Sequence, residues 1–232
     1  MKQDIILTKY AEELTEILVI SGVSGSELPN QDVLFLNGER WELLTQLPYP
    51  VLSPAVGFHK DTLYVAGGVI DGQKTAAVWS FHDKKWSSLP SLPVAQLGGY
   101  IACHGEELTI VGADCKTCMF KLNLQAVPLE WHEYPLTESY HAETCTSVGD
   151  SAYCIVNNQL MRYDMNDDTW ACGATPARST QLHHDAFAVN GRSGLYLVGQ
   201  SLHHYQPFID KWTKYSLSEV CMFINTKYVH YI

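Results

Sequence analysis

Tryptophan recurs at a nearly constant interval along this chain, and this spacing constrains the fold more than any other feature. The intervals between successive members of the series are 45, 45, 39 and 42 residues. The series is Trp41, Trp86, Trp131, Trp170 and Trp212, and the sixth tryptophan, Trp79, is off the period. Periods of about 20 to 50 residues are typical of solenoids, propellers and other repeat architectures. The sequence therefore predicts a repeat fold.

Each periodic tryptophan opens the second strand of a predicted β-hairpin. An alternating run, a polar turn containing Asn, Asp or Gly, and then the tryptophan occur in segments 33–48, 78–93, 119–136, 160–176 and 203–217. A further hairpin is predicted before the last four of these segments, at 55–68, 100–112, 144–156 and 185–199. Two hairpins give four antiparallel strands, called a to d in chain order, in about 42 residues, the size of one propeller blade.

Composition favours the same class of fold. The aromatic share is 11% and the charged share only 17%, and the chain is rich in the Tyr, Val, Ile and Thr residues that suit strands. Apolar runs are short and broken by Gly, Asn and Asp, which disfavours helices of ordinary length. The exception is LTKYAEELTEIL at 7–18. We therefore predict an all-β propeller over residues 16–232, preceded by an N-terminal extension with helical character at 1–15.

The predicted repeats do not give a whole number of four-stranded blades. We assign repeats to 16–48, 51–93, 98–136, 141–176 and 183–217, with a partial sixth at 220–232. The first repeat begins at a strand b, 16–22, and the partial repeat supplies only strands a and b. Two outcomes remain open: a five-bladed ring closed by strand 220–224, or a six-bladed parent interrupted in its last blade. The second is favoured, which predicts an incomplete ring and a fragment or shortened isoform.

Charge and cysteine content exclude several classes of function. The formal net charge is -10 without a basic cluster, so nucleic acid is not an expected partner. The longest apolar runs are of strand length, far short of the ~20 residues that cross a bilayer, so membrane association is not expected. Acidic residues interrupt the N-terminal region where a secretion signal would be apolar. Seven cysteines, an odd number, suit reduced thiols, and we expect a cytoplasmic protein.

The second repeat carries a more specific pattern. The stretch LYVAGG ends strand b in the pair Gly67–Gly68, VWSF at 78–81 gives strand c, and Trp86 opens strand d. This unit resembles a kelch repeat, and the resemblance extends over nearly the whole chain. The glycine pair decays in the other repeats, whereas the spacing and the tryptophan are kept. The resemblance implies a kelch-type β-propeller of four-stranded antiparallel blades, with five recognisable repeats.

The resemblance also implies a function. Kelch domains commonly form the client-binding part of BTB-BACK-kelch proteins, in which the BTB part recruits a cullin-3 ubiquitin ligase. No BTB domain is visible in this chain, so we expect a non-enzymatic protein-protein interaction module that reaches cullin-3 only through a BTB region not present here. Two alternatives are a cytoskeletal, actin-associated kelch protein and a kelch-fold metalloenzyme similar to galactose oxidase. We expect no cofactor.

Histidine and cysteine pairs are the main candidates for metal or redox chemistry. The doublets His183–His184 and His203–His204 contain imidazoles, which are common metal ligands. Adjacent residues of a strand face opposite sides of the sheet, so each doublet can offer only one ligand to a site. Cys115 and Cys118 have CxxC spacing, but positions i and i+3 of a strand also point apart. We therefore predict neither a metal site nor a catalytic residue.

Binding residues are expected where the repeats differ, in the loops at one end of the blades. The b-to-c and d-to-a loops lie on the same face of a propeller whose strand a is innermost, and loops on a rigid scaffold commonly carry binding. Residues suited to anchor a protein client on this face are Tyr49, Gln96, Tyr140, Arg178 and His184. By contrast, Gly67, Gly68 and the periodic tryptophans are expected to be structural repeat residues that pack the blades together.

Overall fold

Antiparallel sheets make up nearly all of the described chain. The computed structural model describes residues 18–20, 31–37, 40–115, 118–136, 142, 144–157, 159–174, 187–191, 194–198 and 202–215. The expected N-terminal extension at 1–15 and the partial repeat at 220–232 lie outside these residues. Within them, a three-stranded sheet is followed by an eight-stranded sheet and two four-stranded sheets, with a short two-stranded ribbon in addition.

The strands group into five blades in chain order. Blade 1 contains β1 (Leu18–Ile20), β2 (Asp32–Asn37) and β3 (Arg40–Gln46). Blade 2 contains β4 (Ala55–His59), β5 (Thr62–Ala66), β8 (Val78–His82) and β9 (Lys85–Leu89). Blade 3 contains β10 (Tyr100–His104), β11 (Glu107–Val111), β12 (Cys118–Asn123) and β13 (Trp131–Pro135). Blade 4 contains β14 (Thr144–Val148), β15 (Ser151–Val156), β16 (Gln159–Asp164) and β17 (Thr169–Cys172). Blade 5 contains β18 (Phe187–Gly191), β19 (Gly194–Val198), β20 (Leu202–Gln206) and β21 (Lys211–Tyr215), with the 3-10 turn η1 (Pro207–Ile209) between the last two.

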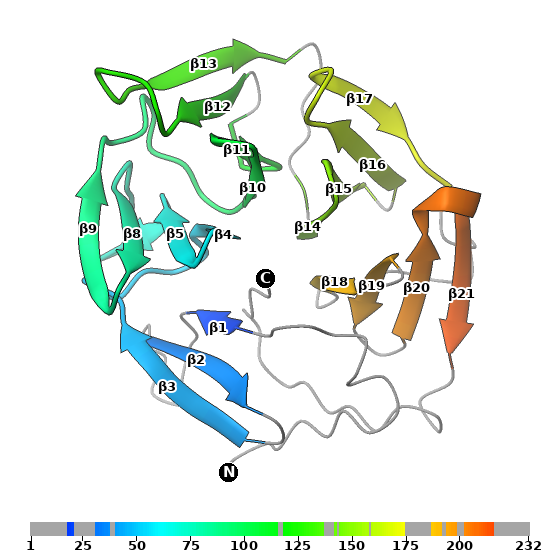
Figure 1. The fold of residues 1–232 in the computed structure, drawn as a ribbon, viewed down its shortest axis with the longest axis horizontal. Helices are drawn as coiled ribbons and strands as arrows, with labels where there is room; N and C mark the ends of the chain where they lie inside the picture. The colour runs from blue at the N-terminus through cyan, green and yellow to red at the C-terminus, as the bar shows by residue number, and fades with distance from the viewer. Residues whose placement is uncertain are drawn as a thin grey trace.

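The blades are arranged around a common centre, as Figure 1 shows. The first strands of blades 2 to 5 (β4, β10, β14 and β18) are innermost and the fourth strands are at the rim. Two neighbouring inner strands, β4 and β10, come close enough to pair in parallel at Val56 and Tyr100, which merges blades 2 and 3 into the eight-stranded sheet. The prediction of an all-β propeller of four-stranded antiparallel blades is confirmed in blades 2 to 5. Closure of the ring depends on residues 220–232 and stays a prediction.

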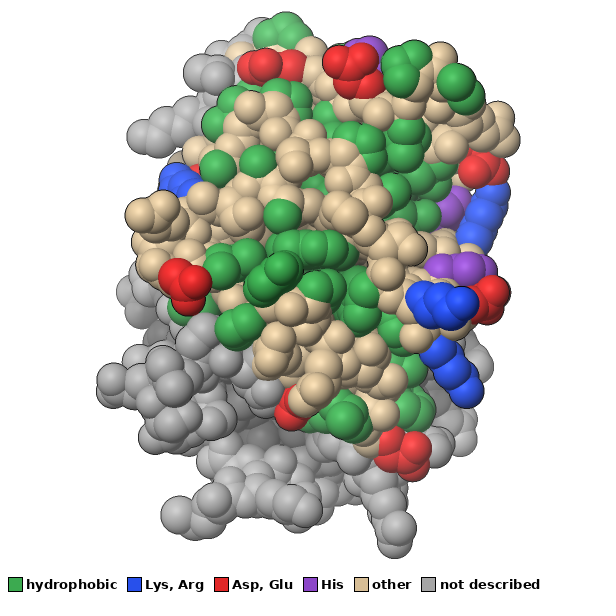
Figure 2. Space-filling model, turned by 90° about the vertical axis from the view of Figure 1, so that its left-hand side faces the viewer, with side chains coloured by type: hydrophobic (Ala, Val, Ile, Leu, Met, Phe, Trp, Pro, Cys, Tyr) green, Lys and Arg blue, Asp and Glu red, His purple; other side chains and the backbone are tan. Residues whose placement is uncertain are grey.

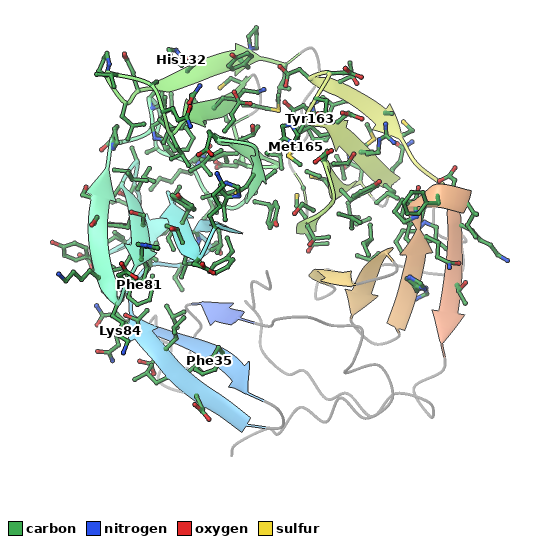
Figure 3. All side chains as sticks on the ribbon, in the orientation of Figure 1. Phe35, Phe81, Lys84, His132, Tyr163 and Met165 are labelled. Carbon is green, nitrogen blue, oxygen red and sulfur yellow. The ribbon has the colours of Figure 1, made fainter. Side chains whose placement is uncertain are left out.

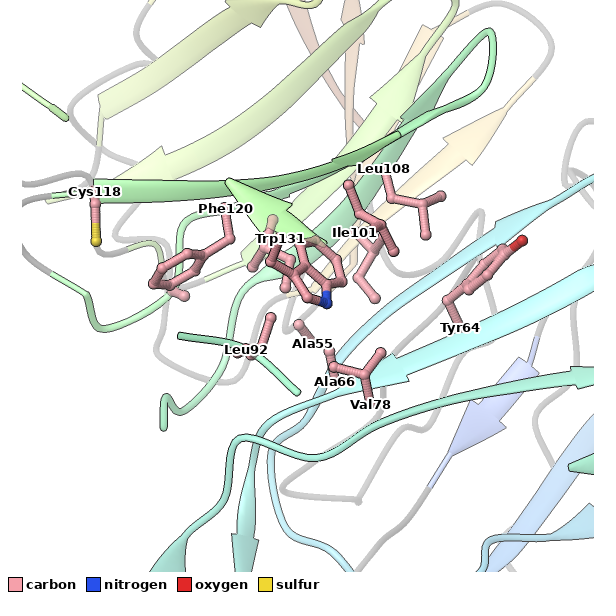
Figure 4. Packing of buried hydrophobic residues seen from close by; sticks show 13 residues of the cluster. Ala55, Tyr64, Ala66, Val78, Leu92, Ile101, Leu108, Cys118, Phe120 and Trp131 are labelled. Carbon is pink, nitrogen blue, oxygen red and sulfur yellow. The ribbon is translucent and has the colours of Figure 1, made fainter. Parts of the chain in front are cut away.

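The hydrophobic core consists of layers between neighbouring blades. The layer between blades 2 and 3 contains Tyr64, Ile101, Phe120 and Trp131. In Figure 4, Ile101 and Trp131 lie between Phe120 on one side and Tyr64 on the other. Equivalent layers lie between blades 1 and 2, between 3 and 4, and between 4 and 5. Figure 3 labels Tyr163 of the layer between blades 3 and 4, beside β16 on the side that faces blade 3. Since each layer needs both blades, the blades stabilise one another as in other repeat folds.

Three of the five periodic tryptophans donate a hydrogen bond to the blade before their own. The indole Nε1 of Trp131 donates to the carbonyl of Pro90 at 2.9 Å, and that of Trp212 donates to the carbonyl of Ala174 at 2.6 Å. Trp86 donates in the same way to Thr45 Oγ1 at 3.2 Å. The hydrogen bonds span 41, 38 and 41 residues, close to one period. The regular spacing of these three tryptophans therefore coincides with a repeated contact between blades.

Three of the tryptophan rings also pack on an aromatic residue of strand c in their own blade. The pairs are Phe81–Trp86, Tyr163–Trp170 and Tyr205–Trp212, with ring centroids 5.0 to 5.1 Å apart. For Trp41 the structure describes the backbone, which lies in β3 opposite Leu36 of β2.

The diglycine at the end of β5 lies where two blades meet. Both residues have positive φ, 65° for Gly67 and 94° for Gly68, a conformation that side chains with a Cβ rarely adopt. A Cβ on Gly67 would lie 2.7 Å from the carbonyl oxygen of Gln96, in the loop between blades 2 and 3. A Cβ on Gly68 would lie 2.5 Å from Val51. The glycines thus allow the loop after β5 to fit between the loops on either side.

Candidate functional site

The loops at one end of blades 2 and 3 form a continuous layer, here called the loop platform. It consists of residues 47–54, 67–77, 90–99 and 112–115. These are two d-to-a loops and two b-to-c loops. Strands b and d of a blade run in the same direction, so the loops that follow them lie at the same end of the blade. Within 67–77, the chain folds into a ribbon of its own, β6 (Val69–Ile70) with β7 (Gln73–Lys74).

Backbone hydrogen bonds join three of these loops to one another. On one side of the ribbon, Leu52 and Val69 exchange two bonds of 2.9 and 2.8 Å. On the other side, Gly68 N–H donates to the carbonyl of Gln96 at 2.8 Å. The two flanking loops are themselves joined, since Gly98 N–H donates to the carbonyl of Ser53 at 2.8 Å. The backbone N–H and C=O groups at these contacts are therefore paired directly with those of the neighbouring loops.

Asp114 extends the platform to the b-to-c loop of blade 3. Its Oδ1 accepts a hydrogen bond from Leu97 N–H at 2.8 Å, and its own N–H donates to the carbonyl of Leu97 at 3.1 Å. The other carboxylate oxygen pairs with Lys74 Nζ of the ribbon. One acidic side chain thus fixes the ribbon and two further loops in place.

Two large apolar side chains on the platform are exposed. Tyr49 is 57% exposed and Val94 is 49% exposed, whereas Leu47 and Leu92 nearby in sequence are buried. The Tyr49 ring rests against Trp79, with centroids 6.2 Å apart and ring planes at 41°. Trp79, the tryptophan off the period, therefore lies in β8 and supports the exposed ring of Tyr49 on the platform.

The predicted client anchors occupy different environments. Tyr49 lies on the surface, whereas the Gln96 side chain is only 1% exposed and its amide nitrogen and oxygen have no hydrogen-bond partner among the described residues. Gln96 acts on the platform through its backbone instead. Tyr140, Arg178 and His184 lie outside the described residues. Which residues contact a client thus stays a prediction, and Gln96 would have to leave its buried site to do so.

Two features of the platform were not predicted. Val94 follows the turn-like sequence SLP and had no periodic signal to single it out. The β6–β7 ribbon lies in a segment for which the sequence predicts only a b-to-c loop, although Asp71–Gly72 between apolar and polar residues is a recognised hairpin signal. Asp71, Gly72 and Gln73 at its tip are all exposed. A search for hairpins shorter than a blade strand would have found this ribbon.

The opposite ends of the blades are more highly charged. Exposed Lys84 lies in the turn between β8 and β9, and Lys60 after β4 pairs with Glu106 of the next blade. Figure 2, which views the side of the molecule on the left of Figure 1, shows Lys, Arg and His side chains mainly along one edge and hydrophobic side chains across the middle. The platform is therefore the less charged of the two ends in blades 2 and 3.

A buried lysine joins blades 3 and 4. Lys121 of β12 is 4% exposed, and its Nζ bonds to Glu107 Oε1 at 2.9 Å and to Asp168 Oδ1 of blade 4. Tyr163 donates to the same oxygen of Asp168 at 2.5 Å. Partial burial disfavours the charged form of Asp168, but the hydrogen bonds from Lys121 and Tyr163 outweigh it and hold its pKa below the usual value. This cluster is a structural contact between blades.

The residues considered for metal or redox chemistry lie mostly in the interior. His203 and His204 of β20 are both buried, at 4% and 5% exposure, and burial together with Lys214 lowers the pKa of His203. The expectation that Cys115 and Cys118 point apart assumed one strand, but Cys115 precedes β12 and Cys118 is its first residue. Burial, followed by the neighbouring Cys115, raises the pKa of Cys118. In the described part of the chain, no group of three or more His, Cys, Asp or Glu side chains could hold a metal ion.

Comparison with protein families agrees with the geometry of blade 2. A family model described as Kelch motif matches residues 50–93, which run from the loop before β4 to the loop after β9. The fold is a kelch-type β-propeller. Kelch repeats generally mediate protein-protein interaction. No curated protein matches the chain. Among the described residues, no helix has the length and apolar character that crossing a bilayer requires.

Proposed function

We propose that the loop platform of this kelch-type propeller binds a protein client and catalyses no reaction. The observation that carries the proposal is the pair of exposed apolar side chains, Tyr49 and Val94, on loops that backbone hydrogen bonds hold together. Loops already ordered before binding lose less conformational freedom on association, so more of the contact energy is retained. Tyrosine is enriched among residues that dominate binding energy.

The platform offers exposed polar residues as well as exposed apolar ones. Tyr49 and Val94 would supply an apolar centre, and the exposed ribbon tip at Asp71 and Gln73 would supply polar contacts around it. Trp79 behind Tyr49 holds the ring in place, which is expected of an anchor that fills a pocket on the partner.

Within this proposal, the propeller acts as the client-recognition part of a cullin-3 ubiquitin ligase adaptor located in the cytoplasm. Its resemblance to the kelch domains of BTB-BACK-kelch proteins supports this role. Binding of cullin-3 itself would belong to a BTB region outside these 232 residues. The propeller would then choose the client and take no direct part in ubiquitin transfer.

A double substitution at the platform tests the proposal. We expect Tyr49→Ala combined with Val94→Asp to reduce capture of clients about 30-fold, since loss of a central anchor costs about 2 kcal/mol or more. Tagged wild-type and variant chains would be incubated with the same cytoplasmic extract, and retained proteins quantified by mass spectrometry. Phe208→Asp is the matched control, because Phe208 is 100% exposed in the turn between β20 and β21, at the opposite end of the blades.

The comparison gives a definite outcome in either direction. Proteins retained equally by wild type and Phe208→Asp, and lost from the double variant, support client binding at the platform. Equal retention by all three chains, or loss only from Phe208→Asp, contradicts it. Far-ultraviolet circular dichroism and thermal unfolding of each chain would show that the substituted surfaces stay folded.

A further inference from the structure

Two cysteines face each other in the inner hairpin of blade 4. Cys145 of β14 and Cys154 of β15 are direct partners in the antiparallel register, and Cys145 Sγ donates a hydrogen bond to Cys154 Sγ at 2.8 Å. Cys154 is 0% exposed, while Cys145 is partly exposed. The two sulfurs therefore already touch while both cysteines are free.

Packing from blade 3 keeps the pair in this position. Cys145 Sγ occupies the space beside Gly112, where a Cβ on the glycine would lie only 2.6 Å from the sulfur. Cys145 also packs against the buried layer that contains Tyr100 and Cys154 between blades 3 and 4. Because this layer leaves little room for another rotamer, the Cys145 side chain stays directed at its partner.

The geometry is close to that of a disulfide. A disulfide has sulfurs about 2.05 Å apart and Cβ atoms about 3.8 Å apart, and directly opposed residues of an antiparallel pair have Cβ atoms about 4.5 to 5.5 Å apart. Starting from a sulfur separation of 2.8 Å, bond formation needs an approach of about 0.8 Å. A small closure of the hairpin provides this movement.

We propose that Cys145 and Cys154 are a site of reversible oxidation to a cross-strand disulfide by hydrogen peroxide or an organic peroxide. The Cys145 thiolate attacks a peroxide oxygen; the O–O bond breaks and an S–O bond forms. After protonation, water leaves when the oxidant is hydrogen peroxide, and the corresponding alcohol leaves when it is an organic peroxide. Cys154 then attacks the sulfur of the resulting sulfenic acid; the S–S bond forms, the S–O bond breaks, and the Cys154 proton leaves with the oxygen as water. Two thiols and one hydrogen peroxide thus give one disulfide and two waters, and an excess of dithiol reductant restores the thiols.

The environment of the pair predicts how the reaction responds to pH. Burial, followed by the hydrogen bond with Cys154, raises the pKa of the Cys145 thiol well above its usual value. Since the thiolate is the reacting form, oxidation is slow near neutral pH and accelerates as pH rises. Once the first step has occurred, the adjacent thiol competes with a second peroxide, which favours the disulfide over further oxidation to sulfinic acid.

Peptide mapping of the intact folded chain tests this site. Trypsin cleaves after Lys121 and Arg162, so residues 122–162 form one peptide whose only cysteines are Cys145 and Cys154. After treatment with hydrogen peroxide, denaturation and alkylation, we expect this peptide to lack both alkyl groups and to weigh less than the reduced form by two hydrogen atoms. Dithiothreitol treatment before alkylation would restore two alkyl groups.

Two variants make the outcome specific. In Cys145→Ser, the peptide should retain one alkylatable thiol and form no internal disulfide, whereas Cys172→Ser should behave as wild type, because exposed Cys172 lies outside this pair. The proposal is overturned if peptide 122–162 remains doubly alkylated while other cysteines are oxidised. It is equally overturned if Cys145 or Cys154 gains oxygen or links to another cysteine without forming the internal bond. Client capture plays no part in this readout, so it is independent of the proposed function.

Discussion

Replacement of Gly57 by alanine is expected to destabilise the propeller by about 3 kcal/mol or more. Gly57 lies in the inner strand β4, and a Cβ there would lie 2.1 Å from the carbonyl oxygen of Ile101 and 2.6 Å from its Cβ. Ile101 belongs to β10, which pairs with β4 in parallel at the centre of the ring. The clash is with backbone inside a sheet, so relief requires the two blades to move apart. The free energy of unfolding in urea would measure the loss.

Gly105→Ala is the matched control for this substitution. Gly105 lies in the turn between β10 and β11 with a φ of 57°, and a Cβ there would meet no heavy atom within 4 Å. Its replacement carries only the backbone strain of a positive φ, about 1 kcal/mol. Equal destabilisation by the two substitutions would contradict the account, because it would mean that β4 and β10 do not approach as closely as the structure shows.

Replacement of Lys121 by alanine is expected to cost about 3 kcal/mol. The change removes the bonds to Glu107 and Asp168, and leaves both carboxylates without their cation. It also removes a contact between the ammonium and the ring of Tyr134, with Nζ 4.9 Å from the ring centroid, and the packing of the aliphatic stem. The expected value is at the lower end for a buried pair, because the two carboxylates are 36% and 45% exposed and can regain water.

Lys121→Met separates the charge from the packing and supplies a pH test. Methionine keeps most of the apolar stem, so we expect a loss of about 1 kcal/mol at neutral pH. The pKa of Asp168 is depressed in the folded protein, so its stabilising contribution is present above about pH 3.9 and disappears as pH falls through the folded value. The difference in unfolding free energy between wild type and Lys121→Met should therefore shrink in acid. A difference that stays constant from pH 7 to about pH 3 would show that the ion pairs contribute nothing.

The repeat pattern was enough to predict the fold class, for a physical reason that the structure makes visible. Trp86, Trp131 and Trp212 recur because each donates to the preceding blade, so the period in the sequence is the period of the contacts between blades. The residues 50–93 that match the Kelch motif coincide with the one repeat in which both the diglycine and the tryptophan are intact. The residues that repeat were therefore sufficient to predict the propeller fold.

The candidate site was predicted less completely, because position in a loop does not determine exposure. Gln96 and Val94 are two residues apart in one loop, yet Gln96 is buried beside Gly67 and Val94 is exposed. The hydrogen bonds that decide this come from Gly68 and Thr75, about 20 to 30 residues earlier in the chain, and no local pattern encodes them. Similarly, CxxC spacing did not predict the relative orientation of Cys115 and Cys118, because Cys115 lies outside the strand that begins at Cys118.

Site-specific photo-crosslinking tests most directly whether the platform is the client-binding surface. A photoreactive benzoyl-phenylalanine would replace Tyr49 in one chain and Phe208 in another, since both side chains are exposed but lie at opposite ends of the blades. If the platform binds the client, irradiation in cells gives a discrete protein adduct from position 49 and none of the same mass from position 208. Adducts of the same mass from both positions, or from position 208 alone, would contradict client binding at the platform.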